Sequence, residues 1–171
     1  MTVSGFWPVT ILVGVFVILQ STVLKNVRIF DVKPDVAFII FMFTSTRQGS
    51  FRSELTGFST GLVQDFLSLA PLGFNALIRT IIGFVYGLLR GRFFLDPIFF
   101  PILVAIIGTL MKYFLSYLLM VVFVSTASAA TVFSSRMWIE VGINSFFAPF
   151  IFALLKLFKF VQMRERDEMF R

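Results

Sequence analysis

The segment SELTGFSTGLVQDFLSL (residues 53–69) places polar and apolar side chains on opposite sides of a helix. At about 100° per residue, its small and acidic residues fall within roughly 80° of arc. A group of this kind needs protein partners, because lipid cannot satisfy it. We therefore expect this face to pack against other helices. The polar arc holds Glu54, Gly57, Gly61, Asp65 and Ser68, and the apolar arc holds Leu55, Phe58, Leu62, Phe66 and Leu69.

The composition of the chain indicates that this helix lies in a membrane protein. Hydrophobic residues make up 58% of the 171 residues and charged residues 14%, and the mean hydropathy is +0.94. Soluble domains average about 25% charged residues, so an ordinary soluble domain, a disordered tail and a fibrous repeat are excluded. Six spans of about 20 residues would use roughly 120 residues. The remainder is too short for a second, soluble domain.

The apolar runs predict an all-α integral membrane protein with a single transmembrane domain, residues 1–171. The first run has no basic residue before it, so we interpret it as a span and not a signal peptide. The second is short for a span, and residues 47–52 are expected to form a loop. The predicted helices are 6–24, 35–46, 53–69, 74–89, 97–123 and 138–158, followed by a charged cytoplasmic tail, 159–171.

The distribution of basic residues favours a cytoplasmic location for both termini. With six spans the two termini share a side, and that side carries nine Lys and Arg residues against four on the other. Cytoplasmic loops are enriched in Lys and Arg. Five of the nine lie in the last 16 residues, so the loops alone do not decide the orientation. The expected location is the cytoplasmic membrane.

Several kinds of chemistry are missing from the sequence. There is no His and no Cys, which removes imidazole and thiolate groups as ligands, bases or nucleophiles. No phosphate-binding loop occurs. We therefore expect no enzyme activity, no cofactor and no metal. The net charge of +6 comes from residues at helix ends, which favours topology and anionic lipid over nucleic acid as its reason.

Ionisable residues inside spans are candidates for function. Asp65 and Arg79 are expected at similar depth, and we favour a structural ion pair between them over a catalytic or transport carboxylate. Lys112 lies near mid-membrane and can reach Asp65, reach a carbonyl group or extend towards the surface. Glu140 follows Arg136 by four residues, and the favoured interpretation is a solvated helix end.

Gly57 and Gly61 are four residues apart, a spacing that lets two helix backbones approach closely. We favour packing within the chain over a homodimer interface. Tyr113 and Tyr117 lie on adjacent turns and can line either a cavity or the lipid interface.

An ordered set of motifs resembles the rod shape-determining protein MreD family. The run from Gly57 to Asp65 is similar to the family pattern Gly-Phe-x-x-Gly-x-x-x-Asp. A short turn with Leu72-Gly73 and a further helix follow it. Lys33-Pro34-Asp35 at the start of the second span and Asn144 with Pro149 in the last helix also fit.

The resemblance implies a bacterial inner-membrane scaffold of the elongation machinery that maintains rod shape. Such proteins bind the bitopic protein MreC and act with MreB, RodA and a class B penicillin-binding protein in peptidoglycan synthesis. The family is thought to share the six-helix fold of the substrate-binding (S-component) subunits of energy-coupling-factor vitamin transporters. The residues expected to have structural or partner-binding roles are Pro34, Asp35, Gly57, Gly61, Asp65, Gly73, Arg79, Lys112, Asn144 and Pro149.

That kinship supplies an alternative function, a solute-binding subunit of a vitamin transporter. A vitamin pocket needs aromatic stacking and convergent polar groups. Phe is abundant, with 25 residues, but most of it lies in apolar runs where core or lipid contact is the simpler explanation. The scaffold is therefore the favoured hypothesis.

Overall fold

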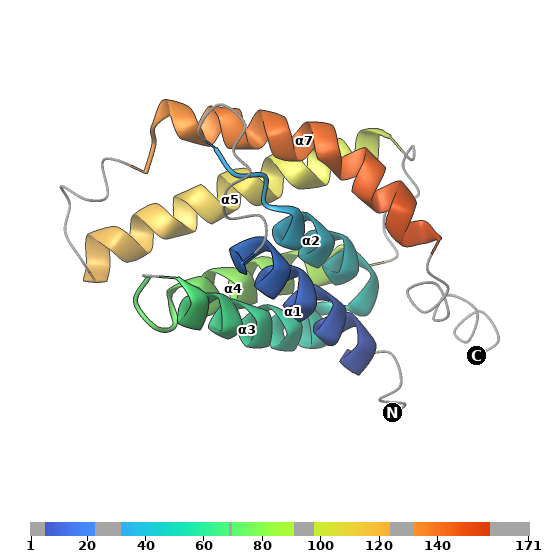
Figure 1. The fold of residues 1–171 in the computed structure, drawn as a ribbon, viewed down its shortest axis with the longest axis horizontal. Coiled ribbons are helices and arrows are strands. Elements are labelled where there is room, and N and C mark those ends of the chain that lie inside the picture. The colour runs from blue at the N-terminus through green and yellow to red at the C-terminus, as the bar shows by residue number, and fades with distance from the viewer. Residues whose placement is uncertain (1–5, 23–31, 69, 91–97, 124–131, 158–171) are drawn as a thin grey trace.

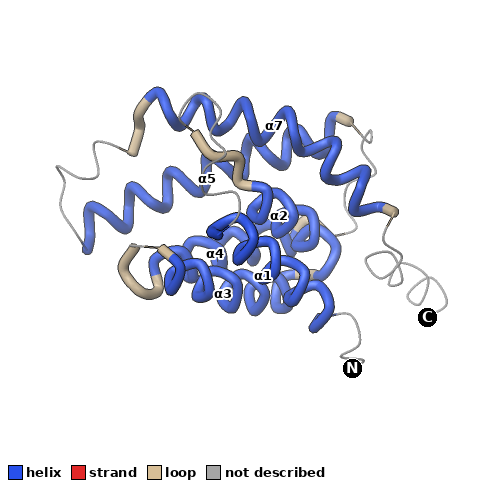
Figure 2. The backbone as a smooth tube through the Cα atoms, in the orientation of Figure 1, coloured by secondary structure: helices blue, strands red, loops and turns tan. Residues whose placement is uncertain are grey.

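The computed structural model describes residues 6–22, 32–68, 70–90, 98–123 and 132–157. This part of the chain is helical apart from short connections (Figure 2). The predicted tail, 159–171, lies outside it. The helices are α1 (Phe6–Thr22), α2 (Val36–Gln48), α3 (Ser50–Leu67), α4 (Phe74–Leu88), α5 (Phe99–Phe123) and α7 (Ser135–Lys156).

Helix α2 lies at the centre of the bundle, and each of the other five helices contacts it (Figure 1). Every residue from Ala37 to Thr46 is buried. A helix that is apolar on all sides is a core helix, and this one forms because Phe, Ile and Met side chains fill all its faces. Its 13 residues cover about 20 Å, less than the ~30 Å of a bilayer core.

The connection between α2 and α3 is shorter than the sequence suggested. The predicted loop, 47–52, is wrong, because α2 continues to Gln48 and α3 begins at Ser50. Gly49 alone joins them, with φ +82°. Side chains other than glycine rarely adopt this backbone conformation, so one glycine reverses the chain where a longer polar loop was expected.

Helices α3 and α4 form a closely packed antiparallel hairpin. A Cβ atom built on Gly61 would lie 2.5 Å from the Cα of Ala76, and one on Gly57 would overlap the carbonyl group of Arg79. The two glycines of the polar arc therefore pack within the chain, as predicted. Because α4 covers both glycines, they are not available as a homodimer interface in this structure.

Aromatic side chains fill the end of the bundle where α2 finishes. Phe43 and Phe152 pack edge to face with ring centroids 4.6 Å apart, and Phe100 contacts Phe152 from α5. The hydroxyl group of Tyr86 donates a hydrogen bond of 2.7 Å to the carbonyl oxygen of Val104. These contacts join α2, α4, α5 and α7.

Among the described residues, α5 and α7 are long and apolar enough to cross a membrane, and α1 and α4 are shorter apolar helices. The two long helices lie side by side across the remainder of the bundle (Figure 1). Large apolar side chains are exposed on several helices, including Ile11, Phe58, Phe114 and Phe150.

Candidate functional site

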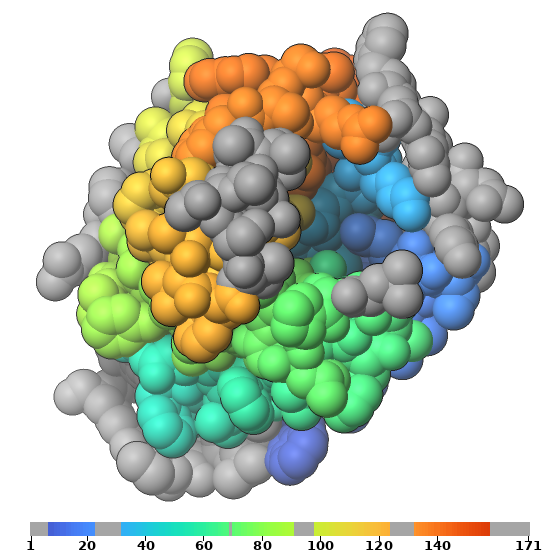
Figure 3. Space-filling view, turned by 90° about the vertical axis from the view of Figure 1, so that its left-hand side faces the viewer, coloured from blue at the N-terminus to red at the C-terminus, as the bar shows by residue number. Residues whose placement is uncertain are grey.

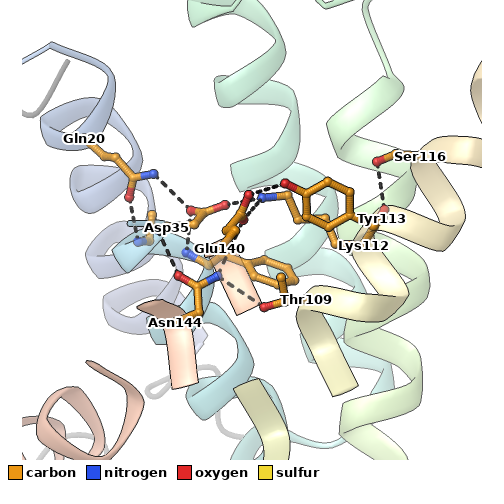
Figure 4. A network of polar contacts seen from close by, with 10 residues as sticks. Gln20, Asp35, Thr109, Lys112, Tyr113, Ser116, Glu140 and Asn144 are labelled. Atoms are coloured by element: carbon orange, nitrogen blue, oxygen red, sulfur yellow. Dashed lines mark hydrogen bonds and ion pairs between the residues drawn. The ribbon is translucent and has the colours of Figure 1, made fainter. Parts of the chain in front are cut away.

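A half-buried lysine joins three helices near the beginning of α7. The ammonium nitrogen of Lys112, on α5, lies 2.8 Å from Oδ2 of Asp35 and 2.7 Å from Oε1 of Glu140. Asp35 caps α2 by accepting a hydrogen bond from the backbone N–H of Phe38, and Glu140 lies on α7. The sequence left the partner of Lys112 open, and these two carboxylates are its partners (Figure 4).

Neutral polar groups complete this network. The side chain of Gln20, on α1, donates to Oδ1 of Asp35 at 3.0 Å and accepts from the backbone N–H of Ala37 at 2.9 Å. The hydroxyl group of Tyr113 donates to Oε2 of Glu140 at 2.6 Å. The network therefore connects α1, α2, α5 and α7 (Figure 4).

Asn144, on α7, makes further links from this helix to the start of α2 and to α5. Its side-chain oxygen accepts from the backbone N–H of Asp35 at 3.2 Å, and its amide group donates to the hydroxyl oxygen of Thr109 at 3.2 Å. Asn144 and Thr109 are fully buried. A buried amide with satisfied hydrogen bonds fixes the relative positions of the helices that it joins.

The prediction that Glu140 lies at a solvated helix end is wrong. Glu140 is only 8% exposed. Helix α7 begins at Ser135, three residues before the predicted start at residue 138, so Glu140 lies more than one turn inside it. Its side chain faces Lys112 and Tyr113 on α5.

Asp65 caps helix α4 instead of forming the predicted ion pair with Arg79. Its carboxylate accepts hydrogen bonds from the backbone N–H groups of Gly73, Asn75 and Ala76, at 2.9, 2.9 and 3.2 Å. The side chain of Asn75 adds a fourth at 2.8 Å. The first N–H groups of a helix have no intrahelical partner, and a carboxylate satisfies them well. No ion pair between Asp65 and Arg79 forms in the described part of the chain.

Arg79 lies deeper in the bundle, one turn beyond the capped N–H groups. Its guanidinium group lies over the rings of Phe38 and Phe41, at 5.9 and 5.8 Å from their centroids. Asp35 and Asp65 are the carboxylates whose charges act on it. One nitrogen, Nη1, is buried and has no hydrogen-bond partner, and Arg79 lines a cavity of about 10 Å³ with Gln64.

The remaining candidate residues from the sequence are one glycine and two prolines, which lie at helix starts or inside a helix. Gly73 adopts the left-handed conformation, φ +93°, immediately before α4, which brings its N–H group to Asp65. Pro34 is half-buried and precedes Asp35. Pro149 lies inside α7, which continues through it.

A cavity of about 400 Å³ adjoins the network. Figure 3 shows a hollow between the orange start of α7 and the light-blue residues before α2. Among the described residues, no group of three or more acids has the arrangement of a metal site. The cavity is lined by Gln20, Val32, Lys33, Asp35, Lys112, Tyr113, Arg136 and Glu140.

The sequence analysis named Asp35, Lys112 and Asn144 but did not bring them together, and it missed Gln20 and Thr109. Gln20 had one available signal, because its amide group is unusual in a mainly apolar helix. Thr109 offered no such signal, since a threonine in a transmembrane helix commonly donates a hydrogen bond to the backbone of its own helix.

A family model described as rod shape-determining protein MreD matches residues 1–158 of the chain. No curated protein matches the chain. No solved structure matches either, so the expected likeness to the S-component fold stays a prediction.

Proposed function

The chain belongs to the rod shape-determining protein MreD family, and on that basis we propose that it is a non-enzymatic scaffold in the bacterial inner membrane. In this proposal it binds MreC and helps to position RodA and a class B penicillin-binding protein along the path of MreB. The family match over residues 1–158 is the observation that carries the proposal. The family acts in rod shape determination, and the specific partners are our inference.

The exposed surface supports a multi-pass membrane location. Large apolar side chains project outward from α1, α3, α5 and α7, at Ile11, Phe58, Phe114 and Phe150 among others. Soluble monomers rarely expose contiguous apolar patches larger than roughly a few hundred Å². The charged groups of Asp35, Lys112 and Glu140 instead point inward, where protein satisfies them.

The arrangement of the helices supports a common side for the two termini. Helix α1 begins and α7 ends on the right in Figure 1, whereas the α3–α4 turn lies at the opposite end. Together with the larger number of Lys and Arg residues expected on the terminal side, this arrangement supports our proposal that the terminal side faces the cytoplasm. The α3–α4 turn and the cavity would then face outward.

The buried polar groups support a scaffold more than a catalyst. Both carboxylates of the network and the carboxylate of Asp65 are occupied by donors from their own chain. What remains for a partner is the apolar lateral surface and the loops. Transmembrane helices associate by close packing on such surfaces, which suits a bitopic partner such as MreC.

Site-specific crosslinking tests this function, because the chain has no native Cys. Single cysteines at the exposed positions Ile11, Phe58, Phe114 and Phe150 each report a different helix. In membranes of a rod-shaped host, we expect crosslinks to the MreC helix from one face of the bundle and not from the others. Failure to recover MreC from any face, with normal levels of the variant proteins, would refute the proposal.

The cavity gives a second candidate, the solute-binding subunit of a vitamin transporter. Its volume of about 400 Å³ falls within the range of small-molecule sites. The lining argues against a vitamin, because among the described residues Tyr113 is its one aromatic residue and most of the others are charged. Recovery of an ATPase module in place of MreC, with saturable stabilisation by a vitamin, would favour this candidate.

A further inference from the structure

We propose that one internal water molecule binds between Gln64 on α3 and Arg79 on α4 and connects this hairpin to the network around Lys112. The proposal does not depend on the scaffold function. It rests on two buried polar atoms that have no hydrogen-bond partner and on a small cavity that both residues line.

One of the two atoms is a donor and the other is an acceptor. Nη1 of Arg79 and Oε1 of Gln64 are both buried, and neither has a hydrogen-bond partner within the described residues. Arg79 as a whole is only 3% exposed, so bulk water does not reach its guanidinium group. Buried polar groups of folded proteins are nearly always bonded to protein or to ordered water.

The protein groups around Arg79 do not satisfy Nη1. Both oxygens of Asp65 already accept hydrogen bonds from the first turn of α4. The rings of Phe38 and Phe41 lie 5.9 and 5.8 Å from the guanidinium carbon, and a ring face stabilises the charge without replacing an oxygen acceptor. A further acceptor is therefore needed beside Nη1.

The cavity between these side chains has room for one water molecule. Its volume is about 10 Å³, and a single water needs roughly 10–15 Å³ and two to four polar partners. A phosphate group or an organic ligand is too large for this space. The cavity is lined by Asp35, Phe38, Gln64, Asn75, Ile78, Arg79 and Lys112.

Water fits the chemistry of the lining because it donates and accepts hydrogen bonds at the same site. It can accept from Nη1 of Arg79 and donate to Oε1 of Gln64. Its second hydrogen can meet Oδ2 of Asp35, which accepts one hydrogen bond in the described chain. Its second lone pair can meet Lys112, whose two ion pairs use two of three N–H bonds.

An ion in the same place would leave part of the lining unsatisfied. Chloride can accept from Arg79 and Lys112, but it cannot donate to Oε1 of Gln64 and it would lie beside the carboxylate of Asp35. A metal cation would be repelled by the two basic side chains. The combination of an unpartnered donor and an unpartnered acceptor therefore favours water.

The water would extend the polar network to the whole bundle. Asp35 is already bonded to Gln20 on α1, and Lys112 is paired with Glu140 on α7. The water adds α3 and α4, so that one continuous set of hydrogen bonds and ion pairs joins the six helices of the described chain. Such a link would hold the α3–α4 hairpin in register against α2 and α5.

Diffraction from crystals of the full-length protein, grown in a lipid mesophase, tests the site directly. At a resolution that shows ordered water, we expect one density peak within roughly 3.2 Å of both Nη1 of Arg79 and Oε1 of Gln64. Crystals grown with bromide in place of chloride should show no anomalous peak there. A direct bond between the two side chains, the lack of a peak, or an anomalous peak would overturn the proposal.

Two variants of Gln64 separate the water bridge from packing. Gln64→Met has nearly the same shape without the acceptor oxygen, and it should lower the folding equilibrium constant roughly tenfold in mixed micelles. Gln64→Glu keeps an oxygen at this position and should stay within about threefold of the wild type. Equal stability of the Gln64→Met variant and the wild type would contradict the bridge.

A double-mutant cycle tests whether Gln64 and Arg79 act together. Arg79→Met should reduce stability less in the Gln64→Met protein than in the wild type, because the bridge is already lost there. Full additivity of the two changes would show that no water couples these side chains.

Discussion

The carboxylate of Asp65 is expected to contribute substantially to stability, because it supports the first turn of α4. It is 2% exposed and accepts three backbone N–H groups and one side-chain amide. Replacement by Ala leaves these donors without their acceptor. The N–H of Ala76 is the most buried of them, whereas the half-buried Gly73 and Asn75 can reach water.

The expected loss follows from those four bonds. A buried donor without an acceptor costs about 1–3 kcal/mol, and removal of a helix cap costs about 1–2 kcal/mol. With partial hydration of the half-buried donors, Asp65→Ala should lower the free energy of unfolding by about 3 kcal/mol. Asp65→Asn keeps one acceptor oxygen and should lose about half as much.

Reversible unfolding in mixed dodecyl maltoside and dodecyl sulfate micelles measures this loss through tryptophan fluorescence. Glu54→Gln is the matched control, because this half-buried acid on the same helix makes no hydrogen bond or ion pair among the described residues. It should change the free energy by less than about 0.5 kcal/mol. Equal stability of Asp65→Ala, Glu54→Gln and the wild type would refute the role of Asp65 as a cap.

Three further changes test the packing, the ion network and the topology. Gly61→Ala should lower the free energy of unfolding by about 1–3 kcal/mol, because the added methyl group overlaps α4. Gly14→Ala is the control, since no atom lies near that position, and it should be neutral or stabilising in the same unfolding assay. Equal effects of the two changes would contradict the close approach of α3 and α4. Lys112→Met should lower the free energy of unfolding by about 3–5 kcal/mol, because it leaves two buried carboxylates without a cation. Adding Glu140→Gln should recover part of this loss. A Lys112→Met variant as stable as the wild type would exclude a stabilising role for the two ion pairs. A cysteine at Leu72, in the α3–α4 turn, should react with an impermeant maleimide on intact spheroplasts, and reaction only after permeabilisation would reverse the orientation.

The packing of α3 was predictable because its signal is local. Gly57, Gly61 and Asp65 recur at helical spacing, and the next helix follows after a short turn. A helix returning from a short turn packs against its predecessor. The 3.6-residue period was therefore sufficient to predict the buried face, whereas the helix that covers it, α4, was not named from the sequence.

The partner of Asp65 was mispredicted because depth in a membrane does not determine direction. Arg79 was expected at a similar depth, but Gly73 turns the chain so that the N–H groups of Asn75 and Ala76 reach the carboxylate first. These donors are ten and eleven residues from Asp65. The competing charge lies a full turn beyond them, over Phe38 and Phe41.

The lysine network could not be assembled from periodicity. Lys112 is 77 residues from Asp35 and 28 from Glu140, and no local pattern determines the relative register of α2, α5 and α7. The available argument was that a buried charge needs a partner. That argument left three alternatives for Lys112, which were Asp65, a carbonyl group and extension towards the surface.

The two ends of the bundle are held by different forces, and this difference has a structural consequence. At the end with the α3–α4 turn, directional ion pairs and hydrogen bonds from Lys112 and Asn144 join three helices, α2, α5 and α7. At the other end, Phe43, Phe100 and Phe152 pack with little directional preference.

Aromatic packing tolerates small shifts between helices, whereas a hydrogen bond weakens steeply when its geometry changes. The polar end therefore sets the register of α5 and α7 against α2, and the apolar end supplies burial. A change in the charge of the cavity would then first alter the positions of α5 and α7, the two longest helices of the described chain.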